Sequence, residues 1–136
     1  MSLWRACVLI IVALTSASAS AAAAAVPQKI LTVDADYLES TMPLYAAVEQ
    51  QATALGKNAD DERRSDIELA RQIRVSDILT ALPEVIAELA AARQADLVLD
   101  RAVARRIGVT ADADITVDIE QRLQSQFAGR ALDLDP

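Results

Sequence analysis

The prediction of the fold starts from the stretch Asp96-Leu97-Val98-Leu99-Asp100. Three apolar residues follow one another between two acids, which is typical of a short buried strand. Far upstream, Lys29-Ile30-Leu31-Thr32-Val33-Asp34 is rich in β-branched residues, and we predict a first strand there. A weaker third strand is predicted over residues 102–107, ended by Gly108. The sheet is therefore expected to join segments that are distant in sequence.

The long stretch between the first two predicted strands favours helices, because its apolar residues recur at steps of three or four. Gly56 suits a helix C-terminus, and Asn58 or Asp60 suits the N-cap of the next helix. Pro83 is expected to kink or divide this second helix, because proline lacks a backbone donor and clashes with the preceding turn. A helical hairpin over about residues 40–94 follows.

The end of the chain favours one more helix. Ile115, Ile119 and Leu123 are spaced four residues apart and predict an amphipathic helix, after which residues 129–136 are expected to form a disordered tail. The resulting fold class is α+β, in the order strand, helix, helix, strand, strand, helix, with the long helical hairpin projecting as an arm from a small β body. We assign to the body core Ile30, Val33, Leu97, Val98, Leu99, Ile115, Ile119 and Leu123.

The N-terminus has the organisation of a secretory signal peptide. Arg5 supplies a positive charge, Ala6–Leu14 is an unbroken apolar run, and Thr15–Ala25 consists of small residues. The alternative is an uncleaved membrane anchor, but spanning a bilayer needs roughly 20 consecutive apolar residues. We therefore predict that residues 1–25 are removed, and that the mature protein works outside the cytoplasm without stable insertion into the membrane.

Two Ala-x-Ala frames suit the cleavage, Ala17-Ser18-Ala19 and Ala23-Ala24-Ala25. Removal of the signal leaves a single domain, residues 26–128, followed by the tail. It also removes Cys7, which lies inside the apolar run and not at the cleavage point. Neither lipidation nor disulfide bonding is therefore expected.

Composition argues against an enzyme and against a nucleic-acid-binding protein. The net charge is −7 and histidine is absent, so the chain lacks both a basic field for nucleic acid and the usual base at neutral pH. Asp112, Asp114 and Asp118 form an acidic cluster that suits weak Ca²⁺ binding. Their spacing differs from a calcium loop, and an acid-rich helix N-terminus is the simpler explanation. No catalytic residue, metal or cofactor is predicted.

Taken together, the motifs resemble the OmpH/Skp family of periplasmic chaperones. Residues 29–34 with Leu38 resemble the family's first strand and the start of its first helix. Ala95–Asp100 resembles its (I/A)DLVVD strand, and Ala113–Thr116 resembles its closing DIT motif. The resemblance implies a homotrimer whose subunits together complete a small sheet and whose arms surround a cavity. It also implies an ATP-independent holdase for unfolded outer-membrane or other envelope proteins in the periplasm.

In this family the arms contact the client, so the resemblance points to apolar arm positions as client-binding residues. The alternative is that these residues join the two helices of the hairpin. The chain departs from the well-known members because its arm is short and its charge is acidic. A second hypothesis is therefore a non-catalytic envelope adaptor or structural protein that binds one folded partner through the hairpin. The candidate client-binding residues are Val48, Leu55, Ile67, Ile73 and Ile78.

Overall fold

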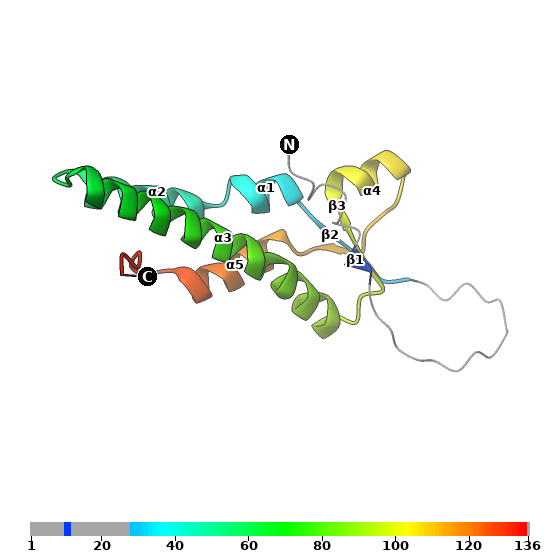
Figure 1. Ribbon diagram of the computed structural model, residues 1–136. Helices are drawn as coiled ribbons and strands as arrows, with labels where there is room; N and C mark the ends of the chain where they lie inside the picture. The colour runs from blue at the N-terminus through cyan, green and yellow to red at the C-terminus, as the bar shows by residue number, and fades with distance from the viewer. Residues whose placement is uncertain (1–9, 12–27, 136) are drawn as a thin grey trace, which may run out of the picture. The chain divides into compact units, whose positions relative to one another are not determined.

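The computed structural model describes residues 10–11 and 28–135 (Figure 1). Most of the predicted signal peptide, residues 1–25, therefore lies outside the described residues. The chain divides into two compact units. We call Met1–Ala35 with Ile86–Val117 the sheet unit, and Asp36–Val85 with Asp118–Pro136 the helix unit.

The sheet is built around the first predicted strand. β2 (Ile30–Val33) lies between β3 (Leu97–Asp100) and β4 (Ala113–Asp114), and it is parallel to both. β1 (Ile10–Ile11) pairs antiparallel with the outer edge of β3, which gives the strand order β1-β3-β2-β4. With the helices below, this confirms the α+β class and the first two predicted strands. β4 was not predicted, because two residues are too few to show a period.

The prediction of a strand over residues 102–107 is wrong, because these residues form helix α4 (Arg101–Ile107). Val103 and Ile107 are four apart, which is a helical step that a six-residue window does not separate from strand alternation. Gly108 ends the helix in the left-handed conformation, with φ 74°, and its amide donates to the Arg105 carbonyl at 3.3 Å. The glycine therefore acts as a helix C-cap and not as the end of a strand.

Two helices occupy most of the predicted hairpin. α2 (Pro43–Gly56) begins with a proline at N1, where the missing N–H costs nothing. α3 (Asp61–Ala92) follows a short turn, and the Asp60 carboxylate accepts the Arg63 amide at 2.8 Å, so Asp60 is its N-cap. Figure 1 shows α2 and α3 running side by side in opposite directions. α3 is continuous through Pro83, which therefore does not divide it.

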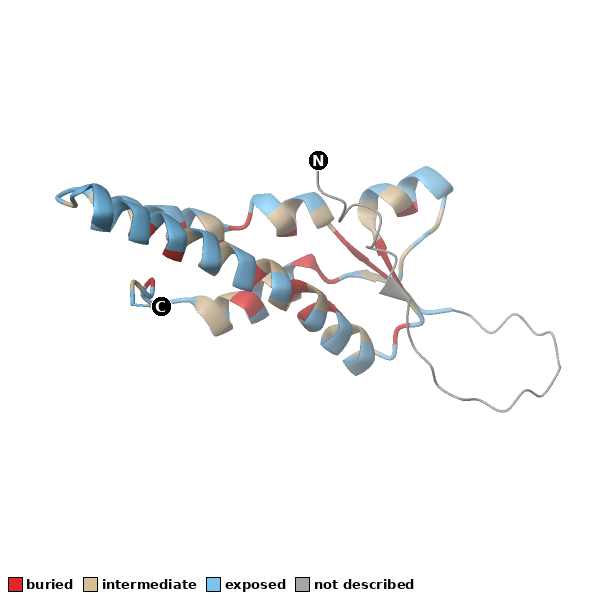
Figure 2. Cartoon of the chain, in the orientation of Figure 1, coloured by how far each residue is buried: buried red, intermediate tan, exposed pale blue. Residues whose placement is uncertain are grey.

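The remaining helices are α1 (Ala35–Ser40) and α5 (Thr116–Phe127). The two last members of the predicted series along α5, Ile119 and Leu123, are fully buried, as is Ile115 immediately before the helix (Figure 2). Of the five other predicted core residues, Ile30 and Leu97 are half-buried. The remaining three, Val33, Val98 and Leu99, are buried.

The C-terminal tail, for which we predicted disorder, is described as far as residue 135. Gly129 adopts φ 73° after the end of α5 and changes the direction of the chain. The Arg130 guanidinium then lies 5.7 Å from the centre of the Phe127 ring, a cation–π distance. The tail forms neither helix nor strand, yet Leu132 is only 7% exposed. It therefore packs against the helix unit to which it belongs.

Candidate functional site

The acids of the sequence motifs bond to the backbone at the start of β2. Asp96, just before β3, accepts the Lys29 amide at 2.7 Å. Asp112, just before β4, accepts the Ile30 amide at 2.7 Å. Each neighbouring strand thus brings one carboxylate to the same end of the central strand. These two bonds fix the register of β3 and of β4 against β2.

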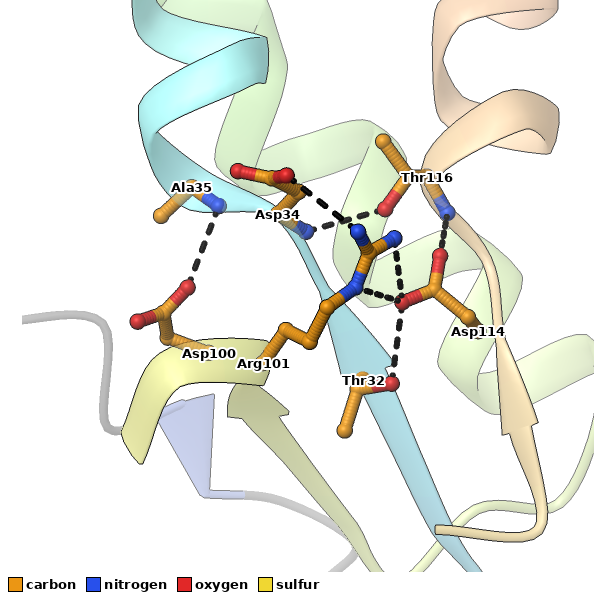
Figure 3. A network of polar contacts seen from close by, with 7 residues as sticks. All are labelled: Thr32, Asp34, Ala35, Asp100, Arg101, Asp114 and Thr116. Carbon is orange, nitrogen blue, oxygen red and sulfur yellow. Dashed lines mark hydrogen bonds and ion pairs between the residues drawn. The ribbon is translucent and has the colours of Figure 1, made fainter. Parts of the chain in front are cut away.

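The other end of β2 is held in the same way (Figure 3). The Thr116 hydroxyl, just after β4, accepts the Asp34 amide at 2.9 Å. Asp100, at the end of β3, accepts the Ala35 amide at 3.2 Å. Two of the three motifs that suggested the family resemblance, Ala95–Asp100 and Ala113–Thr116, therefore supply acceptors for the backbone at the end of β2. The sequence signal for this role is a polar residue at each end of a short strand. We call Asp96, Asp100, Asp112 and Thr116 the strand-end acceptors.

Arg101 joins these strand ends on the side of the sheet seen in Figure 3. Its Nε donates to Asp114 Oδ2 at 3.0 Å, and its Nη1 donates to Asp34 Oδ2 at 3.3 Å. The Thr32 hydroxyl and the Thr116 amide also donate to Asp114, at 3.0 and 3.1 Å. Burial alone would raise the pKa of Asp114, but these hydrogen bonds outweigh it and lower the pKa. The cluster is internally paired, which suits a structural role.

The candidate client-binding residues fall into two groups. Val48, Ile67 and Ile78 are buried, so they pack within the helix unit and are not available to a client. Leu55 and Ile73 are 44% and 46% exposed. Leu69, which we did not select, is 49% exposed and lies one helical turn before Ile73, on the same face of α3. The i, i+4 spacing of Leu69 and Ile73 could have identified it. We call Leu55, Leu69 and Ile73 the exposed apolar set.

Charged side chains join α2 and α3 on another side of α3, because Arg71 is two residues away from both Leu69 and Ile73. Arg71, on α3, pairs with Glu49 of α2 at 2.7 Å and with Glu68 of its own helix at 2.6 Å. The hydrogen bonds from Arg71 and from Gln72 lower the pKa of Glu68 to about 2. A shallow groove of about 450 Å³ adjoins these residues. It is lined by Glu49, Ala52, Thr53, Gly56, Lys57, Arg64, Ile67, Glu68 and Arg71.

The tail occupies a second part of the helix unit. The Arg74 guanidinium donates to the carbonyl oxygens of Arg130 and Ala131, at 3.1 and 2.9 Å. Gln51, on α2, donates to the same Arg130 carbonyl at 3.3 Å. Leu132 follows these carbonyls directly and is buried. Sequence reasoning missed this contact, because nothing in the tail itself indicates that donors on α2 and α3 face it.

Comparisons with family models, with curated proteins and with solved structures find no match for this chain. Among the helices that the structure describes, none is long and apolar enough to cross a membrane. No group of three or more acids, histidines or cysteines within residues 10–11 and 28–135 is arranged to hold a metal ion.

Proposed function

We propose that this chain is an ATP-independent holdase of the periplasm, similar to the OmpH/Skp family, that binds unfolded outer-membrane or other envelope proteins. The observation that carries the proposal is the exposed apolar set on α2 and α3. Large apolar side chains at the surface favour contact with another apolar surface. Many weak contacts of this kind hold a non-native client without an energy source.

The proposal includes export and assembly. Residues 1–25 would be removed as a signal peptide, and this removal would take β1 with it. The Leu97 amide donates to the Lys29 carbonyl at 3.3 Å, so the backbone of Leu97 faces β2. Because successive residues of a strand direct their backbone groups to opposite edges, those of Val98 point toward the outer edge of β3. In the structure that edge pairs with Ile10–Ile11. Without β1 the edge is open, which supports completion of the sheet by neighbouring subunits in a homotrimer.

The helical arm belongs to the same proposal. α2 and the first part of α3 would project from the trimer body, and three such arms would enclose the client. Light scattering after size exclusion tests the assembly: the chain without residues 1–25 should have three times the mass of one subunit. A folded monomer at micromolar concentration would remove the shared cavity and would leave the adaptor hypothesis ahead.

The holding activity is tested with two matched sets of substitutions. Leu55, Leu69 and Ile73 are replaced by serine in one variant, and the exposed apolar residues of the sheet unit, Ile107 and Val117, are replaced by serine in the other. Light scattering then follows the aggregation of an unfolded outer-membrane protein diluted from urea. We expect the first variant to lose most of its protection and the second to keep it. Equal protection by both would exclude the exposed apolar set as the client surface.

The adaptor hypothesis makes the opposite prediction. An apolar set of only three exposed side chains is small, and a few apolar contacts are enough to orient one folded partner. In that case no unfolded protein would be protected, whereas one folded envelope protein would bind saturably. The same serine variant would then weaken that single interaction.

A further inference from the structure

The C-terminal tail is bound to the helix unit mainly through its backbone. Arg74 reaches two successive carbonyl oxygens, those of Arg130 and Ala131, and Gln51 reaches the first of them from the other helix. An arginine carries five N–H donors in a planar fork, so one side chain can serve two adjacent carbonyls. Every polypeptide offers such carbonyls. Recognition by these donors therefore does not depend on the sequence of the bound segment.

One apolar side chain completes the contact. Leu132 is 7% exposed, while Ala131 and Asp133 on either side of it are exposed. The tail has no helix or strand of its own, so its backbone groups are available to the protein that binds it. The bound segment is thus an irregular stretch with two carbonyls followed by one buried apolar residue. Non-native proteins present such stretches repeatedly.

We propose that the tail is an intramolecular substitute for a client. On this proposal Gln51, Arg74 and the surface that covers Leu132 form a binding site for irregular segments of non-native polypeptide, and residues 130–135 compete for it. The inference rests on the proposed function and deepens it, because it assigns the client chemistry and a regulating segment. The two acids of the tail, Asp133 and Asp135, stay near the surface and keep the free tail soluble.

Competition of this kind reduces apparent affinity in proportion to the fraction of sites that are free. A tail docked in about nine of ten molecules would weaken client binding about tenfold. Release of the tail should therefore strengthen binding without any new contact to the client. This direction distinguishes a competing tail from a tail that merely completes the core, since loss of a core segment would weaken both stability and binding.

The experiment measures binding of a fluorescently labelled, permanently unfolded carboxymethylated protein by anisotropy. The full chain is compared with the Leu132→Ser variant, which loosens the tail, and with a chain that ends at Gly129. We expect both variants to bind the probe about tenfold more tightly than the full chain. Adding Arg74→Ala to the shortened chain should abolish the gain. Arg64→Ala, at an exposed arginine of the same helix, should leave the gain intact and serves as the control.

Each outcome decides the inference. Equal probe binding by the full chain and by both variants would overturn the competing tail and leave the holdase proposal standing. Absence of binding by every chain would overturn both. If the shortened chain loses helical circular dichroism, the Leu132→Ser variant decides alone. A further readout is addition of a free peptide with the sequence of residues 128–136, which should displace the probe from the shortened chain. Failure to displace it would also overturn the inference.

Discussion

The sheet unit and the helix unit use their polar side chains differently. In the sheet unit, carboxylates and hydroxyls accept backbone amides at both ends of β2, and Arg101 is paired with Asp34 and Asp114. In the helix unit Arg71 pairs with Glu49 and Glu68, while the exposed apolar set remains at the surface. In the sheet unit the polar contacts fix the positions of the strands relative to one another. In the helix unit apolar side chains remain exposed and available for contacts with other molecules.

The expected energies follow the same division. A hydrogen bond that leaves a buried partner unsatisfied when it is removed costs about 1–3 kcal/mol. An exposed ion pair contributes about 0–1 kcal/mol. Substitutions in the sheet unit should therefore act on stability, and those on the exposed face of α3 should act on binding. Three substitutions test this division, in decreasing order of the expected effect.

The largest effect is expected for Leu31→Ala in β2. The Leu31 side chain is 0% exposed, and its truncation removes buried apolar contacts and leaves a cavity, which should lower the free energy of unfolding by about 2–5 kcal/mol. Leu69→Ala makes the same chemical change at a residue that is 49% exposed, and should cost about 0.5 kcal/mol or less. Urea denaturation followed by circular dichroism measures both. Similar costs at the two positions would abolish the proposed division.

An intermediate effect is expected for Asp114→Ala, which removes the acceptor shared by Thr32, Arg101 and Thr116. The loss should be about 1–3 kcal/mol, because Thr32 and Thr116 are buried and lose their acceptor. Asp77→Ala, at an exposed acid of α3, is the matched control and should cost about 0.5 kcal/mol or less. Urea denaturation at neutral pH gives both values.

The same carboxylate predicts a pH dependence. The folded-state pKa of Asp114 is lower than its ordinary value of 3.8. Its contribution is therefore present above that value and is lost as the pH falls through the folded pKa. Urea midpoints measured from about pH 5 down to about pH 2 should fall less steeply for Asp114→Asn than for the unchanged chain. A parallel decline in the two proteins would show that Asp114 is not responsible.

The smallest effect is expected for Tyr45→Phe in the helix unit. The Tyr45 hydroxyl donates to the Leu38 carbonyl at 2.7 Å, and its loss should cost about 0.5–1 kcal/mol. Burial, and then the charge of Glu39, raise the pKa of Tyr45 to about 12. Any stability that requires the protonated phenol is thus lost as the pH rises through about 12. The phenol ionisation near pH 12, followed by absorbance, should be missing in this variant. An unchanged alkaline titration would show that this ionisation does not belong to Tyr45.

The sequence pattern of a single segment was sufficient to predict an element where its apolar spacing and β-branched residues indicated only one kind of secondary structure. The β-branched run at β2, the apolar triplet of β3 and the four-residue spacing along α5 each predicted the element that the structure has. Asp60 was one of the two predicted N-caps, and it accepts the Arg63 amide. In these cases burial and backbone preference act in the same direction over a few consecutive residues.

Elsewhere the outcome depends on distant partners. Residues 102–107 alternate in a way that fits either a strand or a helix, and Gly108 ends them as the C-cap of a helix, while the Asp100 carboxylate before them bonds to the distant Ala35 amide. The placement of the tail depends on Arg74, which the tail sequence does not reveal. Periodicity identified apolar positions on α2 and α3 but not which of them face inward, so Val48 was grouped with Leu55 although only the latter is exposed.

The bonds at the ends of β2 have a consequence for the order of folding. They join residues that are 65 to 82 positions apart, so the central strand meets its partners only after a long loop has closed. Closure of such non-local contacts is slow compared with helix formation, and α2 and α3, which lie inside that loop, would shorten it by forming first. Under the export that we propose, β2 would cross the membrane before Thr116, its last partner. The sheet could then form only after almost all of the chain had crossed.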